Sequence, residues 1–426
     1  MATLISCILA VACLSIEGVA YSESNSSKGK LVFAHVLYRH GDRTPGKLYP
    51  NDPYGMKPWP QGLQQLSTKG MMQHYLLGQY LRKRYSKLLS KRYVNSEIFV
   101  RSSDKNRALQ SAASDLAGLY PPVKDQMWNP KLDWQPVPIH SVPTDDDYAL
   151  VVDNPCPKYD KVFLEQTKAT IEYYNKQYKD FFDYVKNNSG LEKLDLVTIG
   201  NIYDPLYCES QQGLKLPKWA QAVVNTTTGQ TVYELIVDLK TMAKNLKYDS
   251  DEKAILTGGF LLGEILDRLQ TIAGSNLTKD LNPSKMVMYS AHDDTVMALL
   301  YAMKVVDRPF LVPYAATVLL DLYKARNGGY FVELMYKNNT PVVACKGKNC
   351  KSAESDDSSE EEIDEKQDSG MIRITVPGCP YFSCPLDTFV ATLQNRTSYP
   401  LSKRNRDCGI KDVRKKLRQS VIKDKL

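Results

Sequence analysis

The sequence has little of three features that would indicate other classes of protein. After the first twenty positions, no run approaches the ~18 consecutive apolar residues that a membrane-spanning helix needs. Neither sign of charge dominates: 426 residues carry a net charge of +7, and the basic residues do not gather into an aromatic-interleaved face. No histidine lies near the closely spaced cysteine pairs, as a zinc site would require. We therefore expect no later membrane span, no nucleic-acid partner and no metal.

The first twenty residues differ from the rest of the chain. Leu4 to Leu14 form a short apolar core, and Gly18-Val19-Ala20 resembles a small-residue cleavage site. Residues 1–20 therefore predict a secretory signal peptide, followed by an N-terminal linker over 21–30. We expect a secreted protein, with the lysosomal lumen as the alternative.

Acceptor patterns for N-glycosylation agree with export. Such sequons also arise by chance, so some of them are expected to be unmodified. They lie at Asn187, Asn225, Asn276, Asn338 and Asn395.

A charged motif follows the first strong strand pattern. The apolar run Leu31–Tyr38 predicts a buried strand, and Arg39-His40-Gly41-Asp42-Arg43-Thr44-Pro45 comes directly after it. Buried positive charge without a partner costs several kcal/mol per ion. Arginine forks fit phosphate or carboxylate oxygens. The motif therefore favours an anion site, although a solvated basic turn has the same composition.

Two later segments repeat this arrangement of strand, charge and helix. Glu97–Asp104 is a short strand that brings Arg101 to its carboxyl end, and Lys285–Thr295 is a strand that ends in His292 and Asp293. In open α/β sheets, ligands bind beyond the carboxyl ends of strands. The three segments together predict one anion site at one edge of a sheet.

These residues resemble the histidine acid phosphatase family. Arg-His-Gly-x-Arg-x-Pro near the N-terminus and a late His-Asp pair are its motifs, and the likeness to animal prostatic and lysosomal acid phosphatases runs from about Leu31 to Cys408. The resemblance implies an α/β fold similar to phosphoglycerate mutase: a mixed central sheet flanked by helices, with a smaller helical cap domain inserted. Further matching segments are Trp59–Gly62, Gln73–Tyr75, Tyr203–Ser210 and Met288–Asp293.

The resemblance also implies the chemistry. It predicts a secreted acid phosphatase that hydrolyses phosphate monoesters through a phosphohistidine, without metal or other cofactor. His40 would be the nucleophile and Asp293 the proton donor, roles for which the residue types are suitable. The phosphate-binding residues would be Arg39, Arg43, Arg101 and His292.

One position departs from the family pattern. Asp294 stands where relatives usually have a small hydroxyl residue. Two adjacent carboxylates repel each other, so we expect Asp294 to raise the pKa of Asp293.

The pattern along the chain divides it into segments. A stretch with two helical patterns separates the Arg101 and His292 strands and predicts a cap that sets substrate preference. Nine of the twenty residues over 351–370 are Asp or Glu, which predicts a disordered acidic loop. The expected parts are the first catalytic segment 31–150, the mainly helical cap 151–250, the second catalytic segment 251–402 and the basic tail 403–426.

Seven of the nine cysteines lie beyond the signal peptide, and an exported chain should pair most of them. The resemblance implies Cys156–Cys408 and Cys379–Cys384. Cys345 and Cys350 flank a short loop and are expected to pair locally. The segment that holds the family partner of Cys208 has no cysteine here, so Cys208 is predicted to be a free buried thiol or, alternatively, a link to another chain.

Other functions are also compatible with the sequence. Phosphoryl transfer of the mutase type shares the Arg-His-Gly motif, although secretion and the helical insertion argue against it. The substrate would be a small phosphate monoester, a phosphoprotein or a phospholipid, so a phytase or a lysophospholipid phosphatase is also compatible. A non-catalytic secreted binding protein is the alternative from another class. The relatives suggest a homodimer.

Overall fold

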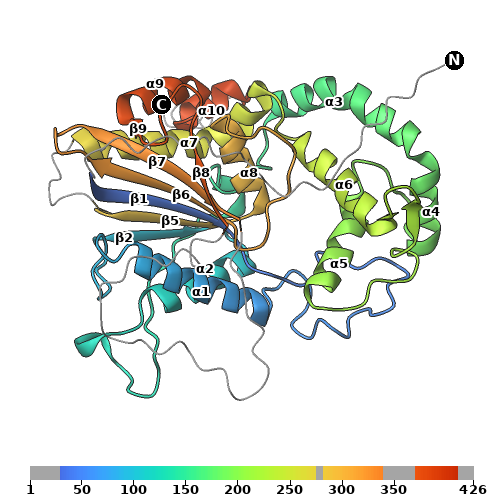
Figure 1. The fold of residues 1–426 in the computed structure, drawn as a ribbon, viewed down its shortest axis with the longest axis horizontal. Coiled ribbons are helices and arrows are strands. Elements are labelled where there is room, and N and C mark those ends of the chain that lie inside the picture. The colour runs from blue at the N-terminus through green and yellow to red at the C-terminus, as the bar shows by residue number, and fades with distance from the viewer. Residues whose placement is uncertain (1–28, 275–281, 339–369, 411–426) are drawn as a thin grey trace, which may run out of the picture.

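A seven-stranded mixed sheet forms the centre of this computed structural model, which describes residues 29–274, 282–338 and 370–410. The strand order is β2-β5-β1-β6-β7-β8, and β9 also pairs with β7. Strands β2, β5 and β1 are parallel, whereas β6, β7, β8 and β9 pair in antiparallel fashion. Helices cover both faces (Figure 1), so the predicted mixed sheet flanked by helices is confirmed.

The sheet and its helices come from both ends of the described chain. The strands are β1 (Lys30–Arg39), β2 (Ile98–Ser102), β5 (Met286–Ala291), β6 (Thr317–Lys324), β7 (Tyr330–Lys337), β8 (Met371–Ile374) and β9 (Cys384–Pro385). The helices are α1 (Thr68–Arg84), α2 (Asn106–Leu119), α7 (Asp251–Gly274), α8 (Asp293–Ala302), α9 (Leu386–Leu393) and α10 (Leu401–Asp407), with 3-10 turns η1 (Lys124–Gln126), η2 (Thr144–Asp146) and η3 (Gln394–Arg396).

Strand β1 is buried on both faces, which explains its nearly continuous apolar sequence. Side chains alternate across a strand, so Phe33 and Leu37 join the core formed with α7, α8 and α9. Val36 and Tyr38 point the other way and pack with α1 and α2. The site at the end of β1 therefore rests on a strand that is packed from both sides.

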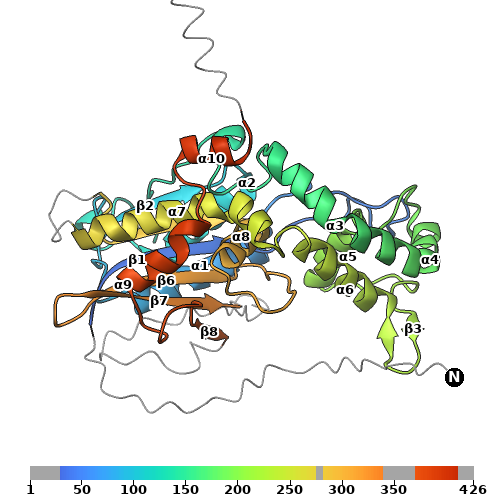
Figure 2. The same ribbon diagram turned by 90° about the horizontal axis from the view of Figure 1, so that it is seen from above.

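A second group of helices lies beside the sheet, past the carboxyl ends of its parallel strands (Figures 1 and 2). This cap has its own hydrophobic core. A capping box between Thr231 and Glu234 begins its last helix. The elements are α3 (Pro157–Gln177), α4 (Lys179–Ser189), α5 (Gly200–Gln211), the hairpin β3 (Val223–Asn225) and β4 (Gln230–Thr231), and α6 (Val232–Asn245).

Two of the predicted disulfides are present. Cys156 bonds to Cys408 across 252 positions, and Cys379 bonds to Cys384. Cys208 is a free buried thiol, as expected, and its Sγ lies 3.5 Å from the hydroxyl of Tyr314. Burial raises the pKa of this thiol to about 12. The predicted Cys345–Cys350 pair lies outside the described residues.

Several other predictions also fall outside the described residues: the signal peptide over 1–20, most of the linker, the acidic loop 351–370 and the sequon at Asn276. The boundary expected at 403 falls inside α10, which continues to Asp407 and leads into the disulfide at Cys408. Within the described ranges, no helix combines the length and apolarity that crossing a bilayer requires. The four described sequon asparagines are exposed: Asn187, Asn225, Asn338 and Asn395.

Candidate active site

The carboxyl ends of three parallel strands bring the candidate residues together. Strand β5 lies between β1 and β2, and the register pairs Arg39 with Ala291. The backbone N–H of His40 donates to the carbonyl of Ala291 at 2.9 Å, so the histidine that follows β1 lies beside the residues that follow β5. His40, His292 and Asp293 therefore lie at one edge of the sheet, as the positions of the strand ends predicted.

His40 is held in one tautomer. Its side chain is 2% exposed, and Nδ1 lies 2.8 Å from the carbonyl oxygen of Gly41. A carbonyl only accepts hydrogen bonds, so Nδ1 carries the proton and Nε2 keeps its lone pair. Burial, followed by the charges of Arg107 and Arg39, lowers the pKa of His40 well below its ordinary value. The ring is therefore neutral, and Nε2 has the form that a nucleophile needs.

Gly41 is required where the motif crosses helix α1. A Cβ built on Gly41 would lie 2.5 Å from the carbonyl oxygen of Gly70, closer than any side chain tolerates. Its backbone N–H donates to the hydroxyl of Ser111 on α2. The glycine thus allows the loop to lie against α1 and holds the carbonyl that selects the tautomer of His40.

His292 stands edge-on to His40, with 5.6 Å between the ring centroids. Its ring accepts a hydrogen bond from the backbone of Thr295, and Nε2 lies 2.8 Å from the hydroxyl of Ser103. Burial, followed by the charge of Arg107, lowers the pKa of His292 to about 3. His292 is thus neutral and is held at the N-terminus of α8.

Three arginines from two segments, the motif after β1 and the start of α2, lie around His40. The guanidinium of Arg39 donates to the carbonyl of Val312 at 2.5 Å and lies 4.2 Å from the centre of the Tyr314 ring. Arg43 forms an ion pair with Asp204 of the cap. Arg107 is the second residue of α2, and burial together with the neighbouring Arg43 lowers its pKa to about 10. The three guanidinium groups repel one another, so the binding of an anion between them is favoured.

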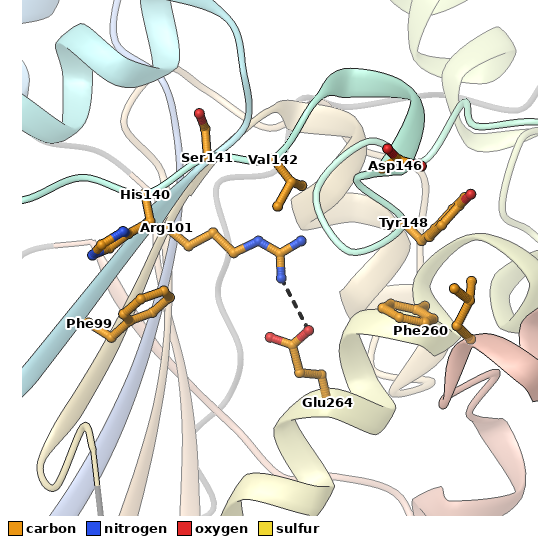
Figure 3. Close-up of a pocket in the computed structure, with 10 residues that line it drawn as sticks. Phe99, Arg101, His140, Ser141, Val142, Asp146, Tyr148, Phe260 and Glu264 are labelled. Carbon is orange, nitrogen blue, oxygen red and sulfur yellow. Dashed lines mark hydrogen bonds and ion pairs between the residues drawn. The ribbon is translucent and has the colours of Figure 1, made fainter.

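Arg101 lies elsewhere. Its guanidinium pairs with Asp147 at 2.6 Å and with Glu264 of α7 at 3.3 Å. It lines a cavity of about 500 Å³ beside Phe99 and His140, whose rings stack at 4.7 Å (Figure 3). The structure does not bring Arg101 together with His40, so the third arginine of the cluster is Arg107.

Sequence reasoning missed Arg107 because it considered residues at strand ends. A signal was available, since the positive end of the helix dipole disfavours a cation in the first turn of a helix. Arg107 occupies that place in α2, and its buried Nε has no hydrogen-bond partner among the described residues. Such a position is stabilised when an anion binds beside it.

Asp293 and Asp294 begin α8, where the helix dipole favours carboxylates. The ammonium of Lys244 lies 2.9 Å from Asp293 Oδ2 and 2.7 Å from Asp294 Oδ2. Burial alone would raise the pKa of Asp293, but Lys244, and then Arg39, outweigh it and hold that pKa well below its usual range. The expected repulsion by Asp294 therefore does not decide the pKa of Asp293, because a lysine lies against both carboxylates.

The described residues contain no group of three or more histidine, cysteine, aspartate or glutamate side chains arranged to hold a metal ion. The charge facing His40 is instead supplied by arginines. A neutral imidazole whose Nε2 is unprotonated can accept a phosphoryl group. The arginines around it can stabilise the charge of that group, and the nearby carboxyl group can supply a proton.

Two curated acid phosphatases are similar to this chain over most of its length. Lysosomal acid phosphatase of Rattus norvegicus is 40% identical over 365 residues, which cover 84% of this chain and 76% of that protein. Prostatic acid phosphatase of Homo sapiens is 40% identical over 316 residues, 73% of this chain and 78% of that protein. The likeness therefore extends over most of both chains.

Solved structures share the fold. The phytase from Citrobacter braakii superposes with a TM-score of 0.61 at 15% identity, covering 88% of this chain and 99% of that one. The apo form of Hafnia alvei phytase gives 0.61 at 18% identity, covering 86% and 97%. Residues 30–337, which include β1, the cap and the His292–Asp293 pair, match the histidine phosphatase superfamily (branch 2). The chain therefore belongs to the histidine phosphatase superfamily, branch 2.

Proposed function

We propose that this protein is an acid phosphatase that hydrolyses phosphate monoesters through a phosphohistidine on His40. The observation that carries the proposal is the neutral imidazole of His40, with Nδ1 bonded to Gly41 and Nε2 unprotonated, among Arg39, Arg43 and Arg107. The acid phosphatase names of the relatives with 40% identity support it.

The reaction takes two displacements. Nε2 of His40 attacks phosphorus, the bond to the ester oxygen breaks, and Asp293 gives its proton to the leaving oxygen. Water then attacks the phosphohistidine, Asp293 takes up the water proton, and phosphate leaves. Asp293 must be protonated for the first step, and its carboxylate is ionised beside Lys244, so turnover requires acid pH.

The arginines take the part that metal ions have in other phosphoryl-transfer sites. We assign Arg39, Arg43 and Arg107 to the equatorial oxygens, where charge must be stabilised in the transition state. His292 is placed to adjoin the same group. Arg101, bonded to two carboxylates, is instead assigned a structural role.

The reaction is metal-independent, and the substrate is a small phosphate monoester, a phosphoprotein or a phospholipid. The protein is secreted or lysosomal, which is supported by the signal-like first twenty residues and by disulfides that persist in oxidising compartments. Glycosylation at the sequons and a homodimer stay predictions.

The test is turnover of p-nitrophenyl phosphate between pH 3 and pH 9 with EDTA present. Wild type should be most active at acid pH, and His40→Ala should lose at least about a thousandfold in kcat. The exposed His140 provides the control, and His140→Ala should remain active. Wild type that is denatured in alkali during turnover should carry a base-stable, acid-labile phosphoryl group that His40→Ala lacks. Turnover by His40→Ala close to that of wild type would exclude the mechanism.

A further inference from the structure

We propose that Lys244 is a positioning residue of this active site, whose ammonium bridges Asp293 and Asp294, so that helix α6 of the cap holds the proton donor and restricts turnover to acid pH. This inference rests on the proposed function. In this role Lys244 acts through Asp293, which its ammonium contacts at 2.9 Å.

The contact joins two helix ends of opposite polarity. Lys244 is the penultimate residue of α6, where the negative end of the helix dipole favours a cation. Asp293 and Asp294 lie at the positive end of α8. Figure 1 shows the end of α6 near the start of α8. The two dipoles and the three charged side chains therefore all favour this one contact.

Neighbouring residues fix the end of α6. The side-chain amide of Asn245 donates to the carbonyl of Phe310 at 2.9 Å, and its oxygen accepts from the hydroxyl of Tyr301 on α8 at 2.5 Å. Lys244 is 7% exposed, so its ammonium has little access to water. A buried cation is stabilised only by close partners, and the two carboxylates provide them.

Asp294 completes the arrangement. Its second oxygen accepts a hydrogen bond from the hydroxyl of Tyr248 and pairs with Lys247 at 3.3 Å. Asp294 thus contacts Lys244, Lys247 and Tyr248. It anchors the lysine, and the lysine in turn binds Asp293, which explains why a second carboxylate follows the proton donor in this chain.

Other charges also face Asp293. Among the lysine, arginine and histidine side chains of the described residues, Lys244 alone has a nitrogen within 4.0 Å of its carboxylate. Arg39 is committed to Val312 and Tyr314. The titratable groups that act on Asp293 from the elements around it are Arg39, Arg107, Tyr203, Lys240, Lys244, Tyr248, His292 and Asp294.

Two substitutions should shift the pH profile in opposite directions. Lys244→Met removes a cation from Asp293, so the carboxyl keeps its proton to higher pH and the alkaline limb of kcat should move up by about 1 pH unit or more. Asp294→Thr removes an anion and leaves Lys244 to Asp293, so the same limb should move down. A purely structural role would lower kcat at every pH without moving the limb.

The experiment measures kcat against pH for wild type, Lys244→Met, Lys244→Arg and Asp294→Thr, with thermal unfolding to verify folding. Lys244→Arg keeps the cation and should retain a limb close to that of wild type. Lys247→Met is the matched control, because Lys247 contacts Asp294 and not Asp293; its limb should move less than half as far as that of Lys244→Met.

The outcomes separate this inference from the proposed function. An active wild type whose limb moves up in Lys244→Met and down in Asp294→Thr supports the role of Lys244. An active wild type with unmoved limbs, or with both limbs moved in one direction, overturns that role and leaves the phosphatase proposal intact. A folded wild type without turnover overturns both. Should Lys244→Met fail to fold, the direction in Asp294→Thr decides alone.

Discussion

Asp204 on cap helix α5 holds Arg43 with both of its carboxylate oxygens. The distances are 2.7 Å from Arg43 Nη2 to Oδ1 and 3.3 Å from Nη1 to Oδ2, and Oδ2 also accepts from the backbone N–H of Gly46 at 2.7 Å. This pair orients an arginine of the site and attaches the cap to the loop that follows β1. The cap is therefore part of the site as well as a cover over it.

Asp204→Asn should lower kcat/KM for phosphate monoesters. The amide keeps the size of the side chain but loses the charge-assisted fork, so Arg43 is less well oriented. Loss of a hydrogen bond to a charged group costs about 1.5–3 kcal/mol, which corresponds to about ten- to a hundredfold in kcat/KM. The half-exposed Asp183, which pairs with Lys179 on α4, provides the control. Equal kinetics for Asp183→Asn and Asp204→Asn would contradict this role of the pair.

Substitution of Arg107 should lower catalysis, whereas substitution of Arg101 should lower stability. Arg107→Ala removes a cation that faces His40 and should lower kcat/KM by about a hundredfold or more. Arg101→Ala leaves Asp147 and Glu264 without their partner and should lower the thermal midpoint while changing kcat/KM far less. Inhibition by inorganic phosphate is the second measurement, and it should weaken only in Arg107→Ala. The reverse pattern would return the third phosphate-binding position to Arg101.

The buried side chain of His35 should make the free energy of unfolding depend on pH. It is 2% exposed in the middle of β1, and neither ring nitrogen has a hydrogen-bond partner among the described residues. Burial, and then the charge of Arg268, lowers its pKa to about 3. An unfolded histidine titrates near ~6.5, so below that pH the unfolded chain binds a proton that the folded chain does not. Stability is therefore lost as pH falls from 6.5 toward 3.

His35→Phe removes this proton and keeps an aromatic ring beside Tyr289. Relative to wild type, its midpoint of thermal unfolding should rise more at pH 4.5 than at pH 7.5. Val36→Ala, a change in the same strand at a residue that does not titrate, provides the control, and its shift should be equal at both pH values. An equal shift of His35→Phe at the two pH values would show that His35 does not titrate between the folded and unfolded states.

Local sequence patterns predicted much of the fold and part of the site. The apolar run before Arg39 predicted β1, because a strand buried on both faces must be apolar almost throughout. The histidines and the aspartate at strand ends were identified, since parallel strands place their carboxyl ends at one edge. Arg101 also lies near a strand end. Its side chain, however, lies on the same face of β2 as that of Phe99, two positions earlier, and both line the cavity beside α7 instead of the site at His40.

What the sequence alone determined is therefore local: which segments form strands, which chemical groups follow them, and, with the family resemblance, which cysteines pair. What only the tertiary structure decided is how distant segments meet. Arg107 replaces Arg101 because α2 brings its first turn to His40, and Lys244 reaches Asp294 across 50 positions. Hydrophobic periodicity states which side of an element is buried, but not which partner covers it. Charges act over a few ångströms in space, so the protonation of Asp293 depended on a contact that no local pattern contains.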